Sequence, residues 1–105
     1  MQGAMIVYTT CATEDEARHI ARVLVEERLA ACVQRLPGLR STYVWKGEVH
    51  DEPEVLLIIK MRSGLYPQVE ARIRALHSYE VPEIVALPIE TGSEDYLAWL
   101  NASTT

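Results

Sequence analysis

The sequence lacks the features that mark several large functional classes. No apolar run approaches the roughly 20 residues that a membrane-spanning helix needs, so we expect no membrane partner. Acidic residues outnumber basic ones and give a formal net charge of −5, whereas nucleic acids and anionic membrane surfaces attract basic faces. The sequence therefore argues against a nucleic-acid partner.

Common catalytic motifs are also missing. The sequence contains no Cys-x-x-Cys pair, no His-Glu-x-x-His and no glycine-rich phosphate loop, and no serine lies in a nucleophile elbow. We therefore expect a protein without enzymatic activity. The start Met-Gln-Gly-Ala has no basic segment of a secretory signal, and the only two cysteines suit a reducing compartment. Together these observations predict a cytoplasmic protein.

The apolar residues that are present predict one α+β domain covering residues 1–105. Helical periodicity follows a capping box at Thr13-Glu14-Asp15-Glu16 and extends to about Leu29 or Ala30. A second helix should follow Ser63-Gly64, and a short third one should begin at Ser93. Strands are predicted at 5–10, 32–45, 55–61 and 84–89, with an edge position or a bulge at Pro37-Gly38. The order β-α-β-β-α-β plus a C-terminal helix is the ferredoxin-like split β-α-β arrangement.

The two middle strands predict a hairpin that is too long for a monomer. Each arm has about 14 residues and spans roughly 45 Å, whereas a compact domain of this length is about 34 Å across. The overhang carries apolar residues, including Val44, Trp45 and Val49. Because exposed apolar strands are a liability, we expect the hairpin to mediate association into a homo-oligomer. The alternative is a shorter hairpin, interrupted at Asp51-Glu52-Pro53.

Residues 77–83 place several metal-binding side chains in one short segment before the last strand. His77 is a candidate ligand for copper, zinc or nickel, and Cys11 is a soft candidate ligand if it ionises. Glu80 and Glu83 are candidate hard donors. The simpler alternatives are that His77 caps a helix, that Cys11 is an unpartnered loop thiol, and that the two glutamates form ion pairs with Lys60 or Arg62.

Segments spread over nearly the whole chain share the order and spacing of a known family: Leu29-Ala30-Ala31-Cys32, Pro37-Gly38, Tyr43-Val44-Trp45-Lys46-Gly47, Ile59-Lys60, His77-Ser78-Tyr79-Glu80-Val81-Pro82-Glu83 and Tyr96-Leu97-Ala98-Trp99-Leu100. On these residues the sequence resembles the CutA divalent-cation tolerance family. The resemblance implies a PII-like, ferredoxin-like fold and a cytoplasmic homotrimer held by long hairpins. It also implies a link to tolerance of divalent cations, with copper first, and a metal site near His77 and Cys11. No metal is expected to be required for folding.

A second functional hypothesis belongs to a different class. Aromatic and charged residues could line a cleft between subunits, where a PII-like signalling trimer would hold a small anionic ligand: Tyr43, Trp45, Lys60, Tyr79 and Trp99. The alternative is that the aromatic side chains serve packing in the core or at an interface.

Overall fold

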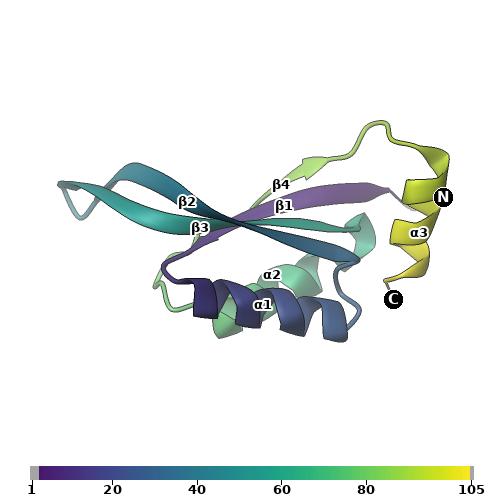
Figure 1. Ribbon diagram of the computed structural model, residues 1–105, viewed down its shortest axis with the longest axis horizontal. Helices are drawn as coiled ribbons and strands as arrows, with labels where there is room; N and C mark the ends of the chain where they lie inside the picture. Colours follow the sequence, from purple (N-terminus) through teal and green to yellow (C-terminus); the bar gives the residue numbers. More distant parts are fainter. Residues whose placement is uncertain (1–2, 105) are drawn as a thin grey trace.

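A computed structural model describes residues 3–104 and shows a four-stranded antiparallel sheet with three α-helices (Figure 1). The strands are β1 (Ala4–Cys11), β2 (Cys32–Trp45), β3 (Glu48–Arg62) and β4 (Val85–Pro88), in the spatial order β2-β3-β1-β4. The helices are α1 (Glu14–Glu26), α2 (Tyr66–Leu76), which follows the 3-10 turn Ser63–Leu65, and α3 (Glu94–Ala102). The predicted ferredoxin-like α+β arrangement is confirmed.

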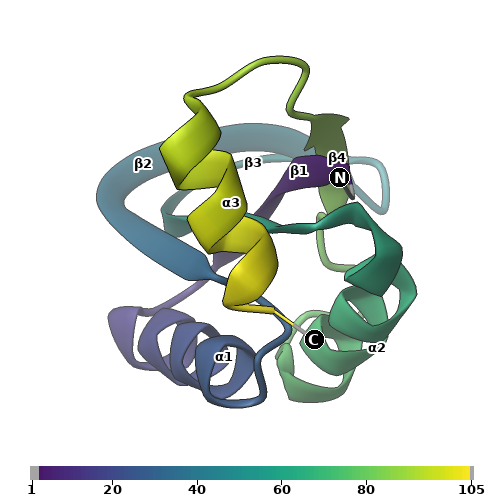
Figure 2. The same ribbon diagram turned by 90° about the vertical axis from the view of Figure 1, so that its right-hand side faces the viewer.

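Helices α1 and α2 cover one face of the sheet, while α3 lies across its end (Figures 1 and 2). Alternate residues of β3 point into the core because side chains of a strand alternate between its faces: Val55, Leu57, Ile59 and Met61 are all buried. Ile20 and Leu24 of α1 and Val69 and Ile73 of α2 close the core from the other side.

Helix α1 begins as predicted and ends earlier than predicted. The Thr13 hydroxyl accepts a hydrogen bond from the Glu16 amide at 3.1 Å, which caps the first turn. The helix ends at Glu26 rather than near Leu29, because Arg28 adopts a left-handed conformation with φ of 59°. The amides of Leu29 and Ala30 then both donate to the carbonyl of Leu24, which closes the helix end.

The β2–β3 hairpin extends well beyond the helices, as its length predicted (Figure 1). Pairing continues from Cys32↔Lys60 to Trp45↔Glu48, with a register shift at the predicted bulge between Leu36 and Leu39. The interruption considered at residues 51–53 does not occur, since β3 runs through them. The molecule accordingly measures 45 × 25 × 23 Å.

Several apolar side chains remain accessible at the hairpin tip and on the last strand. Val44 and Val49 near the hairpin tip are 68% and 73% exposed, and Val85 and Leu87 of the last strand are about half exposed. Strand β4 is shorter at both ends than the predicted 84–89 and pairs with β1 from Met5↔Pro88 to Tyr8↔Val85. Within residues 3–104, no helix is long and apolar enough to cross a bilayer.

Candidate metal site and the adjacent groove

Three segments that are distant in the sequence meet at one end of β1. Strand β1 reaches Cys11 because its pairing with β3 continues to Cys11↔Val55. The first turn of α1 then places Glu16 near the strand end, and His77 follows directly on α2. The fold thus brings together the two ligands predicted from the sequence, Cys11 and His77.

The imidazole of His77 is buried and uses both of its ring nitrogens. Nδ1 accepts a hydrogen bond from the Tyr79 amide at 3.1 Å, so this nitrogen carries the lone pair. Nε2 lies 2.8 Å from the carbonyl oxygen of Thr10 and therefore carries the proton that it donates. His77 consequently joins the end of β1 to its own loop, in addition to capping α2 through its amide, which donates to Ile73.

The thiol of Cys11 lies 4.0 Å from Nε2 of His77 and is fully buried. Burial raises the pKa of this thiol to about 12, and the negative charges of Glu16 and Glu54 add to the effect. Cys11 is therefore a neutral thiol at pH 7. It becomes a metal ligand only if its proton leaves when the ion enters.

Glu16 completes a group of three candidate ligands. One ligand atom each from Cys11, Glu16 and His77 lies within 4.8 Å of the others. Oε2 of Glu16 accepts from the Ser78 amide at 2.8 Å, whereas Oε1 is buried without a hydrogen-bond partner. The sequence interpretation missed this role because it assigned the Glu16 carboxylate to the capping box, where it would reach back to Thr13.

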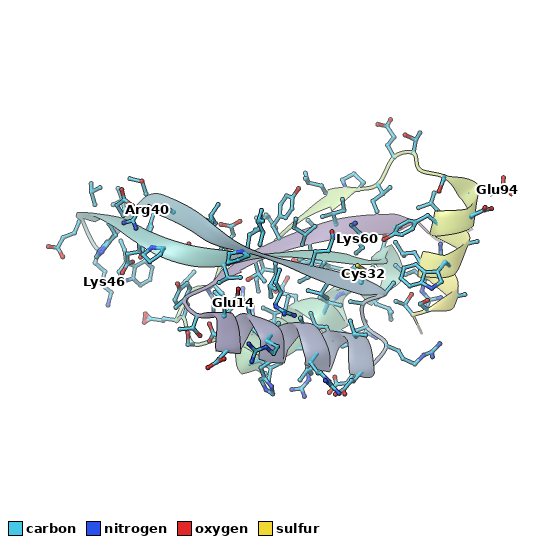
Figure 3. The ribbon with its side chains drawn as sticks, in the orientation of Figure 1. Glu14, Cys32, Arg40, Lys46, Lys60 and Glu94 are labelled. Atoms are coloured by element: carbon cyan, nitrogen blue, oxygen red, sulfur yellow. The ribbon has the colours of Figure 1, made fainter. Side chains whose placement is uncertain are left out.

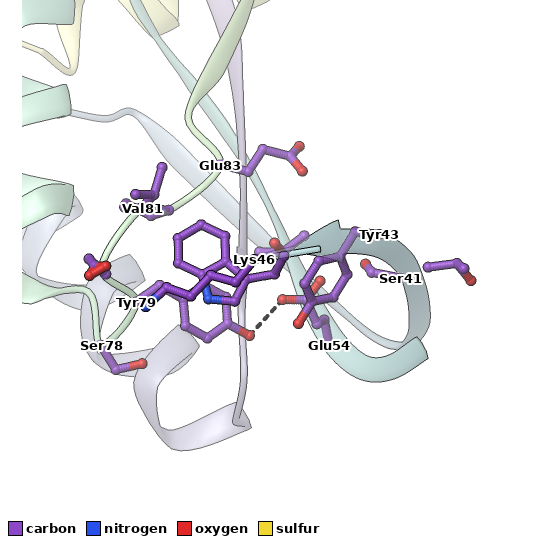
Figure 4. A pocket seen from close by; sticks show the side chains of 13 residues that line it. Ser41, Tyr43, Lys46, Glu54, Ser78, Tyr79, Val81 and Glu83 are labelled. Carbon is purple, nitrogen blue, oxygen red and sulfur yellow. Dashed lines mark hydrogen bonds between the residues drawn. The ribbon is translucent and has the colours of Figure 1, made fainter. Parts of the chain in front are cut away.

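Glu80 and Glu83 do not join this group but line a neighbouring groove of about 870 Å³. The groove lies between the hairpin and the loop that follows α2, with Tyr43, Trp45 and Tyr79 in its walls (Figure 4). Three of the five residues predicted for a cleft between subunits therefore line this groove within one chain. The sequence interpretation missed two charged residues of this groove, Lys46 and Glu54; an acidic residue directly before the apolar run of β3 was the available signal for Glu54.

Glu54 lies in the groove wall and is only 8% exposed. The hydroxyl of Tyr79 donates to its Oε2 at 2.6 Å, the dashed line in Figure 4. Burial and this hydrogen bond together raise the pKa of the Tyr79 phenol well above its ordinary value. Tyr43 donates to Glu52 in the same way, and that bond raises the pKa of the Tyr43 phenol.

Lys60 and Trp99, the other two predicted cleft residues, lie at the opposite end of the sheet. Figure 3 labels Lys60 and Cys32 close to α3, far from Lys46 and Arg40 on the hairpin. The Lys60 ammonium lies 5.7 Å from the ring centroid of Tyr96, and that ring lies 5.5 Å from Trp99. Within one chain these residues therefore do not line the groove, and their place in a cleft between subunits stays a prediction.

Comparison with known proteins gives consistent matches over nearly the whole chain. Residues 5–103 match the family model described as CutA1 divalent ion tolerance protein. The divalent-cation tolerance protein CutA of Thermus thermophilus is 52% identical over 99 residues, covering 94% of this chain and 96% of that protein. The mouse protein CutA is 45% identical over 92% of this chain, which spans only 55% of the mouse protein.

Solved structures agree with the sequence matches. The crystal structure of CutA1 from Oryza sativa superimposes with a TM-score of 0.96 at 40% identity, and the match covers 99% of this chain and 95% of the rice chain. Fold and sequence therefore point to the same family.

Proposed function

Because the chain belongs to the CutA1 divalent ion tolerance protein family, we propose that it binds a divalent cation, copper first, and contributes to tolerance of that cation without catalysing a reaction. The observation that carries this proposal is the convergence of Cys11, Glu16 and His77, whose ligand atoms lie within 4.8 Å of one another. A sulfur, an imidazole nitrogen and a carboxylate oxygen form a set of intermediate softness, which suits copper and zinc better than magnesium or calcium.

One feature of the three residues favours a bound ion, whereas another must change before an ion can bind. Oε1 of Glu16 is buried without a partner, and a cation would satisfy this atom. Both ring nitrogens of His77, however, are engaged by Thr10 and Tyr79. Coordination by His77 therefore requires one of these hydrogen bonds to open, and coordination by Cys11 requires loss of the thiol proton.

The test is a calorimetric titration of the tag-free protein with copper and with zinc. We expect one saturable site per subunit, lost in Cys11→Ser and retained in Cys32→Ser, which removes a half-buried thiol at the other end of the molecule. Glu16→Gln should weaken binding and keep the fold, as judged by circular dichroism. Equal affinity of Cys11→Ser and the unmutated protein would assign the metal to another site.

We further propose that the protein acts as a cytoplasmic homotrimer whose hairpins pair between subunits. Val44 and Val49 at the hairpin tip and Val85 and Leu87 on β4 are apolar and exposed, which supports association of subunits through the hairpin and β4. The two free cysteines suit a reducing compartment. Light scattering of the purified protein tests the oligomeric state, and cell fractionation tests the location.

The charges of the groove do not support a small anionic ligand there. Three carboxylates line the groove, those of Glu54, Glu80 and Glu83, against the single ammonium of Lys46. Lys60 lies against Tyr96, so within one chain it adds no positive charge to the groove. Like charges would repel an anion, so the electrostatics of the groove favour a ligand of the opposite sign.

A further inference from the structure

The loop that follows α2 is fastened by side chains of the candidate metal site. The Ser78 amide donates to Oε2 of Glu16 at 2.8 Å, and the Tyr79 amide donates to Nδ1 of His77 at 3.1 Å. Two of the three candidate ligands therefore hold two consecutive amides of this loop. Both amides and both acceptors belong to the same chain, so this arrangement does not depend on how subunits associate.

The single proton of the His77 ring decides which hydrogen bonds the ring can make. A neutral imidazole carries one proton on its two nitrogens, and the nitrogen without the proton accepts. The Tyr79 amide requires a lone pair on Nδ1, so the proton lies on Nε2, which donates to the Thr10 carbonyl at 2.8 Å. Histidine binds divalent metals as a neutral imidazole, through a nitrogen lone pair.

Coordination through either nitrogen of His77 deprives the Tyr79 amide of its acceptor. If Nδ1 coordinates, its lone pair is no longer available to the amide. If Nε2 coordinates, it gives up its proton, and the neutral ring then carries a proton on Nδ1, where it donates instead of accepting. Nε2 lies 4.0 Å from the sulfur of Cys11, so we expect this nitrogen to coordinate. The Thr10 carbonyl then loses its donor as well.

Glu16 differs from His77 because it can coordinate an ion without releasing the loop. Its Oε1 is buried and has no hydrogen-bond partner within residues 3–104, whereas Oε2 holds the Ser78 amide. A carboxylate has two accepting oxygens, so one can coordinate while the other continues to accept from the amide. An ion at this site should therefore affect the neighbouring amides of Ser78 and Tyr79 differently.

We propose that the Tyr79 amide is released from His77 when a divalent cation binds at the candidate metal site. The Ser78 amide stays bonded to Glu16, so the loop is then held at only one of its two amides. The Tyr79 ring lies 4.8 Å from the His77 ring, and its hydroxyl donates to Glu54 of β3. The release therefore changes the support of a side chain that joins the loop to the sheet. This inference rests on the proposed metal function and adds which part of the chain responds to the ion.

The test is hydrogen exchange of individual amides, measured by nuclear magnetic resonance on the intact protein with and without saturating zinc. Zinc has a filled d shell and is diamagnetic, and calorimetry on the same sample shows whether the site is filled. We expect the Tyr79 amide to exchange about five- to tenfold faster with zinc, the factor that corresponds to loss of one hydrogen bond. The Ser78 amide should change by less than about twofold, because its hydrogen bond is retained. A ligand that only stabilises the native state would slow exchange instead.

Two variants and a second ion separate release at this site from a general effect of metal. Cys32→Ser keeps the site and should behave like the unmutated protein, whereas Cys11→Ser should lose zinc binding and with it the faster exchange. Magnesium, which prefers oxygen ligands, should leave both amides unchanged. The nitrogen chemical shifts of His77 give a second readout: they should show the proton on Nε2 without zinc and on Nδ1 with zinc.

Each outcome decides for or against the release. Saturable zinc binding with an unchanged Tyr79 amide would overturn this inference and leave the proposed function standing. Equal acceleration at Ser78 and Tyr79 would also overturn it, because the whole loop would then have opened. Faster exchange at Tyr79 with the proton still on Nε2 would support the release and assign coordination to Nδ1. Absence of zinc binding would overturn the proposed function and this inference together. The unmutated protein decides the question even if Cys11→Ser does not fold.

Discussion

Replacing Cys11 by alanine should change how the stability of the protein depends on pH. Cys11 is fully buried, and its thiol pKa is raised from about 9 to about 12 by burial and by the nearby carboxylates of Glu16 and Glu54. In the unfolded chain the same thiol is exposed and returns to its ordinary value. Between these two pKa values, unfolding releases a proton that the native protein holds.

Proton linkage gives the sign and the size of the effect that Cys11 has on the free energy of unfolding as the pH changes. Because the native state binds more protons than the unfolded state above pH 9, the stabilisation due to Cys11 is complete below pH 9 and is lost as the pH rises towards 12. The loss is about 1.4 kcal/mol per pH unit at most, hence roughly 2 to 3 kcal/mol between pH 9 and pH 11. Cys11→Ala removes this dependence and leaves a small cavity, which lowers the free energy of unfolding by about 1 kcal/mol. The variant should therefore be less stable at pH 8 and equal or more stable at pH 11.

The measurement is urea unfolding at pH 8, 9, 10 and 11, with a reductant present and the protein concentration held constant because the protein is expected to associate. The informative quantity is the difference in free energy of unfolding between the variant and the unmutated protein at each pH, since other titrating groups cancel in it. Cys32→Ala keeps Cys11 and serves as the control, because it should retain the loss of stability that Cys11 causes above pH 9. A difference for Cys11→Ala that does not change with pH would show that the thiol is not desolvated, and our account of the site would be wrong.

Three further perturbations test other parts of the molecule. Iodoacetamide at pH 8 should modify Cys32 in the native protein and Cys11 only after unfolding, as read by mass spectrometry; equal rates would contradict the burial of Cys11. Tyr79→Phe should lower the free energy of unfolding by about 1 to 3 kcal/mol, because it leaves the buried Glu54 carboxylate without its donor; no loss in urea titrations would mean that water replaces the hydroxyl. Val44→Asp, at a position 68% exposed in the single chain, should leave the fold intact by circular dichroism and reduce the solution mass in light scattering; an unchanged mass would exclude the hairpin tip from the interface.

Most of the fold could be predicted from the sequence because its signals are local. The continuous apolar run from Val55 to Met61 predicts a strand of the core, and the Thr13 cap specifies where α1 begins. The end of α1 was predicted too late because Arg28 takes a left-handed conformation that favours glycine. No property of an arginine in the sequence indicates that the helix stops there.

The candidate site was harder to predict because it depends on distances between segments far apart in the sequence. Cys11 and His77 were identified separately by residue type, and only the fold shows that they approach to 4.0 Å across 66 positions. Lys60 was predicted to line a cleft between subunits together with Trp45; within one chain it lies six residues along β3 from Glu54, or about 20 Å, so only a second subunit could bring it to the groove. Residue type predicted what these side chains can do, but the position along an extended strand decides which of them can act together.

Tyr79 links the candidate metal site to Glu54. Its amide donates to Nδ1 of His77, and its hydroxyl donates to Glu54 in the groove. The negative charge of Glu54 already acts on the Cys11 thiol, and the same charge attracts a metal ion held by Cys11 and His77. Glu54→Gln removes this charge and keeps an oxygen that can accept from Tyr79, so it should weaken zinc binding while the fold is retained. Calorimetric zinc titrations of the variant and the unmutated protein measure the effect, and equal affinities would mean that Tyr79 joins Glu54 to the metal site structurally but not energetically.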